Sequence, residues 1–171
     1  MTEKEINIGL DKWEGKRPAV EDVDCWLSEI GLEAEEVNVE KPWGAYWKIK
    51  QEQTEYFLEL FFSDIKDLSE IKKRFLSSKI LLVGFDRRLS WKYHNRRAEE
   101  WKVVSGQVGV ERSDTDIEPK EEILYEAGDR ISLKQGERHR LAGRNGWGLV
   151  AEIWIHSDIN NLSDEKDVVR V

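Results

Sequence analysis

LSWKYHNRRAEEWKVVSG, residues 89–106, holds the most informative pattern of this chain. Lys92 and His94 stand two residues apart in a segment that favours a strand, so their side chains point to the same face. Glu99 follows a short turn and lies on what should be the next antiparallel strand. The stretch therefore predicts two neighbouring strands whose polar side chains converge.

A second stretch, GDRISLKQGERHRL at residues 128–141, places His139 at the start of another strand, after a turn that contains glycine. Two histidines and one carboxylate from three strands can bind a metal ion on one side and leave positions open for substrate and water. His94, Glu99 and His139 are therefore candidate metal ligands.

From Lys79 onward, short runs rich in Val, Ile, Leu and Trp alternate with turn signals. The predicted strands are KILLVGF, RLSWKYH, EEWKVVS, QVGVE, EEILYE, DRISLK, HRLAG and GLVAEIWIH. The turn-forming pairs between them are Ser105-Gly106, Ser113-Asp114, Ala127-Gly128, Gln135-Gly136 and Asn145-Gly146. Many short strands without intervening helices predict an all-β fold, either an antiparallel barrel or a double-sheet jelly roll.

The part of the chain before this barrel has a different pattern. Residues 1–17 are polar and predict a loosely ordered arm. Apolar residues at helical spacing predict one amphipathic helix over 18–30 and another over 54–62, and KPWGAYWKI between them predicts a turn that enters a short strand. We therefore expect an N-terminal arm and helical extension over 1–78 that packs on a barrel over 79–171.

The length of 171 residues is typical of one domain. The 27 basic and 35 acidic residues give a net charge of −8, which disfavours nucleic acid and anionic lipid as partners. The single cysteine cannot form an internal disulfide, and the start of the sequence lacks the apolar run of a signal peptide. We therefore expect a cytoplasmic protein with no nucleic-acid partner and no membrane partner.

The two stretches also match the paired motif of cupins, His-x4-Glu-x6-Gly followed by Gly-x7-Gly-x2-His. The matching residues are His94, Glu99, Gly106, Gly128, Gly136 and His139. More closely, KPWG at 41–44, residues 89–106, GERHRL at 136–141 and DEKDVVR at 164–170 resemble the cupin domain of type II mannose-6-phosphate isomerases. Small bacterial proteins described as mannose-6-phosphate or phosphoheptose isomerases are similar in the same way. The resemblance implies a cupin double-stranded β-helix, or jelly-roll barrel, with N-terminal helices.

The resemblance implies a metal-dependent aldose–ketose isomerase that acts on a sugar phosphate. Such an enzyme moves a proton between C1 and C2 through an enediol, while a divalent ion stabilises the developing oxyanion. The ligands of that ion, which would be zinc, manganese or iron, would be His94, Glu99 and His139. Arg170 matches the arginine of the family's acidic-acidic-Val-Arg ending, near the active site, and is expected to take part in catalysis.

Lys92 stands where the relatives have Gln and where many cupins have a histidine ligand. A lysine ammonium repels a divalent cation, so either Lys92 deprotonates, or it swings away, or its charge takes the place of the metal. Lys92 is a candidate catalytic residue and equally a candidate ion-pair partner of Glu99. Arg97 and Arg140 are candidate substrate-binding residues, because guanidinium groups match the geometry of phosphate.

Two other functions fit the same residues. One is a non-catalytic sugar-binding or regulatory cupin without metal, in which the His–Glu–His set is a hydrogen-bonded polar cluster. The other is a metal-dependent oxygenase, because two histidines and a carboxylate also hold non-haem iron. We further expect a homodimer, because pairing between copies commonly covers edge strands. His156, which follows the last apolar strand, is expected on the surface.

Overall fold

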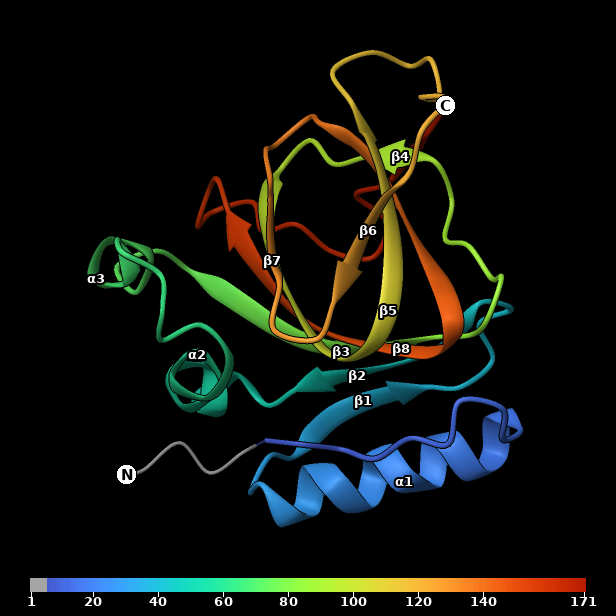
Figure 1. Ribbon diagram of the computed structural model, residues 1–171. Helices are drawn as coiled ribbons and strands as arrows, with labels where there is room; N and C mark the ends of the chain where they lie inside the picture. The colour runs from blue at the N-terminus through green and yellow to red at the C-terminus, as the bar shows by residue number, and fades with distance from the viewer. Residues whose placement is uncertain (1–5) are drawn as a thin grey trace.

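The computed structural model describes residues 6–171, so the beginning of the arm expected over 1–17 lies outside the described residues. The described chain forms a nine-stranded sheet that curves into a barrel, with helices beside it (Figure 1). The strands are β1 (Ala34–Asn38), β2 (Gly44–Ile49), β3 (Leu76–Val83), β4 (Lys92–Tyr93), β5 (Arg97–Ser113), β6 (Ile123–Glu126), β7 (Arg130–Leu133), β8 (Arg138–His156) and β9 (Val169–Arg170). The α-helices are α1 (Lys16–Glu29), α2 (Thr54–Phe61) and α3 (Leu68–Ile71). Within residues 6–171, no helix has both the length and the apolar character that crossing a membrane requires.

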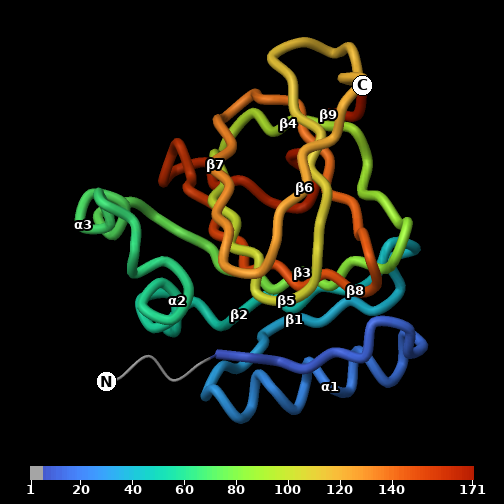
Figure 2. The backbone as a smooth tube through the Cα atoms, in the orientation of Figure 1, coloured from blue at the N-terminus to red at the C-terminus, as the bar shows by residue number. Residues whose placement is uncertain are grey.

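The barrel is built on two long strands, β5 and β8, which pair antiparallel over most of their length. β6 and β7 pair with β5, whereas β3 and β4 pair with β8, and β2 and β1 extend the sheet beyond β3. The backbone tube in Figure 2 shows how these strands enclose the barrel interior. The predicted all-β jelly-roll barrel with N-terminal helices is therefore confirmed.

Two of the predicted turn-forming pairs lie inside long strands, Ser105-Gly106 within β5 and Asn145-Gly146 within β8. Gly106, Asn145 and Gly146 nevertheless have the positive φ expected of left-handed turn residues. The pairing of β5 with β8 shifts register on both sides of Ser105, which is the mark of a β-bulge. Gly106 has a φ of 76°, and a Cβ there would lie 2.1 Å from the carbonyl oxygen of Trp147. Glycine therefore lets the long strand bend where a larger residue would break the pairing.

Two apolar clusters lie on opposite faces of β3, because successive side chains of a strand point to opposite sides. Leu81 and Val83 face the barrel interior, where they pack in one cluster with Trp101. Ile80 and Leu82 belong to the other cluster, together with side chains from the helices. The cluster members contributed by α1 and α2 are Ala19, Val23, Trp26, Leu27, Phe57, Leu58 and Phe61. The helices therefore cover the face of β3 that points away from the barrel interior.

The N-terminal helices agree with the predicted ones in position, although α1 begins at Lys16, two residues before the predicted start. Proline lacks an N–H, and the N–H groups of the first helical turn have no partner within the helix, so Pro18 is tolerated inside that turn. The predicted strand within KPWGAYWKI is β2. β1, which pairs with β2, was not predicted.

Candidate metal centre and pocket

The structure brings His94, Glu99 and His139 together inside the barrel. β4 pairs with β8 at Lys92 and His139, and this pairing places His94, just after β4, beside His139. Glu99 reaches the same point from β5, whose side chains alternate between the interior and the outside. One potential ligand atom from each of the three lies within 4.8 Å of the others, and each residue is only 2% exposed.

Backbone carbonyl groups orient both histidine rings. His94 Nδ1 lies 2.6 Å from the carbonyl oxygen of Asp167, and His139 Nδ1 lies 2.9 Å from that of Glu137. A carbonyl oxygen only accepts hydrogen bonds, so each Nδ1 carries the proton and donates it. With Nδ1 protonated, Nε2 is the ring nitrogen that can present a lone pair toward the centre, which is the arrangement of metal-binding histidines.

Two buried atoms at this centre lack partners. Within residues 6–171, neither Glu99 Oε2 nor His139 Nε2 has a hydrogen-bond partner, although the two atoms lie 3.4 Å apart. A carboxylate oxygen and a nitrogen lone pair repel each other unless a cation or a proton lies between them. A divalent cation fits this donor set, because it would bind both atoms at once.

Arg97 supplies a positive charge at the other side of the centre. Its Nε donates to Glu99 Oε1 at 2.8 Å, and its Nη2 donates to His94 Nε2 at 3.1 Å. The guanidinium carbon also lies 3.6 Å from the centre of the Trp154 ring. Burial alone would raise the pKa of Glu99, but His94, Arg97 and His139 outweigh it and hold that pKa well below its usual value. The Glu99 carboxyl is therefore ionised at neutral pH.

A pocket of about 130 Å³ reaches this centre at Glu99 and Arg97, whereas His94 and His139 do not line it. Its basic lining residues are Lys41, Lys79, Lys92, Arg97 and Arg170. Its acidic lining residues are Glu99, Glu152 and Glu165, and its aromatic ones are Trp43, Tyr46, Trp101 and Trp154. Basic side chains outnumber acidic ones, so the pocket favours a negatively charged ligand although the whole chain is acidic.

Glu152 is one of the pocket residues that the sequence analysis missed, as are Lys41 and Lys79. Glu152 Oε1 accepts a hydrogen bond from Trp101 Nε1 at 3.0 Å, and Glu152 is 5% exposed. Burial, and next the charge of Glu99, raise the pKa of Glu152 to about 7, while Lys79 opposes them. Such a carboxyl can take up or release a proton near neutral pH. One acidic residue inside the apolar run GLVAEIWIH was the available signal.

The other predicted site residues divide into two groups. Lys92 and Arg170 pair across β4 and β9, and both line the pocket. Burial lowers the pKa of Lys92, while the charges of Glu99 and Glu152 act in the opposite direction. Arg140 is not among the pocket-lining residues. Its guanidinium forms ion pairs with two carboxylates, those of Glu111 and Glu118.

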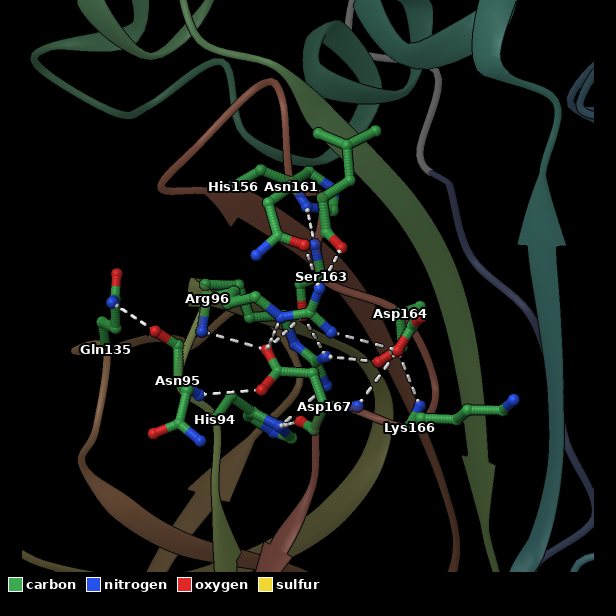
Figure 3. Close-up of polar contacts among 12 residues, drawn as sticks. His94, Asn95, Arg96, Gln135, His156, Asn161, Ser163, Asp164, Lys166 and Asp167 are labelled. Carbon is green, nitrogen blue, oxygen red and sulfur yellow. Dashed lines mark hydrogen bonds and ion pairs between the residues drawn. The ribbon is translucent and has the colours of Figure 1, made fainter.

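The prediction that His156 lies on the surface is wrong, because it is 3% exposed. It ends β8 and contacts residues 157–168, the segment between β8 and β9 that we name the strap. His156 Nδ1 accepts the backbone N–H of Ser163 at 3.0 Å (Figure 3). Its Nε2 lies 2.8 Å from the Ser77 hydroxyl. Burial and the charge of Arg97 lower the pKa of His156 to about 4. This histidine therefore has a structural role, as a neutral anchor of the strap.

No protein-family model matches this sequence, and neither does any curated protein. Among solved structures, an oxalate decarboxylase variant from Bacillus subtilis is 13% identical and has a TM-score of 0.56, with 80% of this chain and 30% of that chain covered. Vicilin from hazelnut, Corylus avellana, is 14% identical and has a TM-score of 0.52, with 76% and 34% covered. A Cupin 2 conserved barrel domain protein from Salinispora arenicola is 14% identical, with a TM-score of 0.40 and coverage of 48% and 64%. This chain thus spans about a third of the oxalate decarboxylase and vicilin chains, and its fold is a cupin jelly-roll barrel.

Proposed function

We propose that this protein is a metal-dependent aldose–ketose isomerase that acts on a sugar phosphate. The observation that carries the proposal is the pair of buried, unpartnered atoms Glu99 Oε2 and His139 Nε2 beside a basic pocket. His94, Glu99 and His139 would hold zinc, manganese or iron. The bound ion would supply a Lewis acid that stabilises negative charge on the sugar oxygens.

The lining of the pocket supports a phosphorylated sugar as the substrate. Lys41 and Arg170 are the basic residues that we assign to the phosphate, because neither has an ion-pair partner among residues 6–171. Lys79, by contrast, is paired with Glu165, and Arg97 is paired with Glu99. Aromatic rings such as Trp43 offer an apolar face to a sugar ring.

Glu152 and Lys92 are the groups that we assign to proton transfer. The Glu152 carboxylate takes the proton from C2, and the electron pair of that bond forms the double bond between C1 and C2. The carbonyl electrons move to O1, which takes a proton from Lys92. Lys92 then recovers a proton from O2, and Glu152 returns its proton to C1, so the aldose becomes a ketose with no net change in atoms.

The proposal is tested with protein purified without added metal. Elemental analysis should find about one equivalent of a divalent metal, and hexose or heptose phosphates in D₂O should gain deuterium at carbon. The combination of bound metal with deuterium incorporation supports the isomerase. Bound metal without exchange of any sugar phosphate contradicts the isomerase and leaves the metal site in place.

The second candidate is a non-catalytic sugar-binding cupin without metal, and the position of Arg97 favours it. The guanidinium already satisfies His94 Nε2 and Glu99 Oε1, which would otherwise be free to bind a metal ion. In that case elemental analysis finds no metal, and a sugar phosphate binds saturably without exchanging hydrogen for deuterium. The two candidates therefore give opposite results in the same pair of measurements.

Replacing Lys92 by Gln should separate metal binding from catalysis. The change removes a positive charge beside the metal centre, so a divalent ion should bind several-fold more tightly. Turnover should nevertheless fall by about 100-fold or more, because the group that exchanges protons with O1 and O2 is lost. Isothermal titration calorimetry with Zn²⁺ and the deuterium exchange assay measure the two effects.

The matched control is Lys134→Gln, which removes an exposed lysine near the start of β8 and should change neither quantity. If Lys92→Gln leaves both the zinc affinity and the turnover unchanged, Lys92 has no part in the site.

A further inference from the structure

The strap, residues 157–168, crosses beside the metal centre and contacts the turn that follows His94. Figure 3 shows Asp167 in the middle of this contact, with its polar atoms directed toward His94, Asn95, Arg96 and Ser163. In the sequence, Asp167 lies 73 residues after His94. The strap therefore joins distant parts of the chain at the candidate metal ligand.

Asp167 contacts this region with both its backbone and its side chain. Its carbonyl oxygen accepts the Nδ1–H of His94 at 2.6 Å. Its carboxylate accepts two consecutive backbone N–H groups, that of Asn95 at Oδ1 and that of Arg96 at Oδ2, both at 3.0 Å. One buried residue thus fixes the backbone next to the ligand and also the ring of the ligand itself.

The same residue reaches Arg97 through Ser163. The Ser163 hydroxyl donates to Asp167 Oδ2 at 2.6 Å and accepts from Arg97 Nη1 at 2.8 Å. Arg97 Nη1 also donates to the strap carbonyl of Asp164 at 3.2 Å. The strap thereby restrains the guanidinium that contacts His94 Nε2 on the opposite edge of the ring. The strap therefore acts on both ring nitrogens of His94. It contacts Nδ1 directly, through the Asp167 carbonyl, and Nε2 indirectly, through Arg97.

We infer that Asp167 is a positioning residue, which holds His94 in the Nδ1-protonated form and aims its Nε2 at the metal centre. The inference rests on the proposed metal site. A partner that orients a metal-binding histidine fixes its tautomer and raises its basicity, so loss of the partner weakens metal binding. Asp167 itself does not touch the ion or the substrate.

The test compares zinc affinity in Asp167→Ala, Asp167→Asn and the wild type, by competition with a chelating dye. Asp167→Ala keeps the carbonyl that accepts from His94 Nδ1 but removes the carboxylate that anchors this carbonyl to the N–H groups of Asn95 and Arg96. Zn²⁺ should therefore bind more weakly, by up to about 10- to 100-fold, the range for a lost orienting partner. Asp167→Asn keeps one acceptor oxygen and should show a smaller loss. Asp158→Ala is the matched control, because Asp158 lies in the same strap and caps only its own turn through the N–H of Asn160. Its affinity should equal that of the wild type.

A second measurement needs no metal. Nitrogen-15 NMR of the three histidines reports which ring nitrogen carries the proton, and His94 should move from the Nδ1-protonated form toward a mixture in the variants. If Asp167→Ala fails to fold, as judged by circular dichroism, Asp167→Asn decides the matter. Wild-type zinc affinity and an unchanged His94 tautomer in a folded Asp167 variant would overturn the inference. If the wild type binds no zinc, the proposed metal site is wrong, and the tautomer of His94 alone decides the inference.

Discussion

His139→Ala should lower the metal content from about one equivalent to below about one tenth, and turnover should fall about 1,000-fold or more with it. Three protein ligands leave no redundancy, so the loss of one removes most of the binding free energy. His139 is the best ligand to replace, because Nε2 has no partner among residues 6–171 and the change breaks a single hydrogen bond, from Nδ1 to Glu137.

Thermal unfolding gives a second measure of the same prediction. At a metal concentration 100 times Kd, binding should stabilise the wild type by about 2.7 kcal/mol, and this increment should vanish in His139→Ala. Lys134→Gln is the control, because it removes an exposed side chain from the turn that precedes β8 and His139. Equal metal content in His139→Ala and the wild type would show that the ion binds elsewhere.

Glu152→Gln should lower turnover by about 100- to 10,000-fold, because the proposed carrier of the C2 proton is lost. Gln has the same shape and keeps an oxygen for the Trp101 indole, which donates to Oε1 at 3.0 Å. Metal affinity should change much less than turnover, because Glu152 is not one of the three ligands. Deuterium exchange and zinc titration on the same preparation measure both effects.

The same substitution should stabilise the metal-free protein at pH 8. The pKa of Glu152 is about 7 in the folded protein and about 4.5 in the unfolded chain. Between pH 4.5 and pH 7, Glu152 has lost its proton in the unfolded chain but still holds it in the folded protein. The free energy of unfolding therefore falls as pH rises through this range. Gln does not titrate, so the variant avoids this fall in the free energy of unfolding. It should be more stable than the wild type by about 3 kcal/mol above pH 7 and equally stable below pH 4.5.

Urea unfolding in the presence of EDTA at several pH values measures this difference. A variant that loses activity and gains stability would mark Glu152 as a residue kept for function at the expense of stability. Full turnover in Glu152→Gln would show that another group moves the proton. An equal stability difference at pH 4 and pH 8 would show that the carboxyl does not titrate as described.

The sequence predicted the parts of the fold whose pattern is local. α1 and α2 have apolar residues at helical spacing, and the alternation in β5 continues from Arg97 to Val103. β1 has the sequence AEEVN, which lacks that signal, and it is a strand because it pairs with β2. The left-handed residues inside β5 and β8 were predicted, but the continuation of each strand through them was not, because a bulge and a turn use the same residue types.

The three candidate metal ligands could be predicted from the sequence, but the contacts around them could not. The spacing of His94 and Glu99, with His139 after a later turn, placed three side chains at one point, as the structure shows. The engagement of Arg97 could not be read from the sequence, because its partner Ser163 lies 66 residues away. Likewise the position of His156 depends on the strap, so its burial follows from tertiary packing.

Because the strap follows the barrel strands in the sequence, the barrel strands and the contact that orients His94 are synthesised at different times. All strands of the barrel except the two-residue β9 precede residue 157, whereas the carbonyl that orients His94 follows it. During synthesis, the eight strands that precede residue 157 therefore emerge before the carbonyl that orients His94. If the proposed metal site is correct, it reaches its full affinity for a cation only after the strap has been added to the barrel.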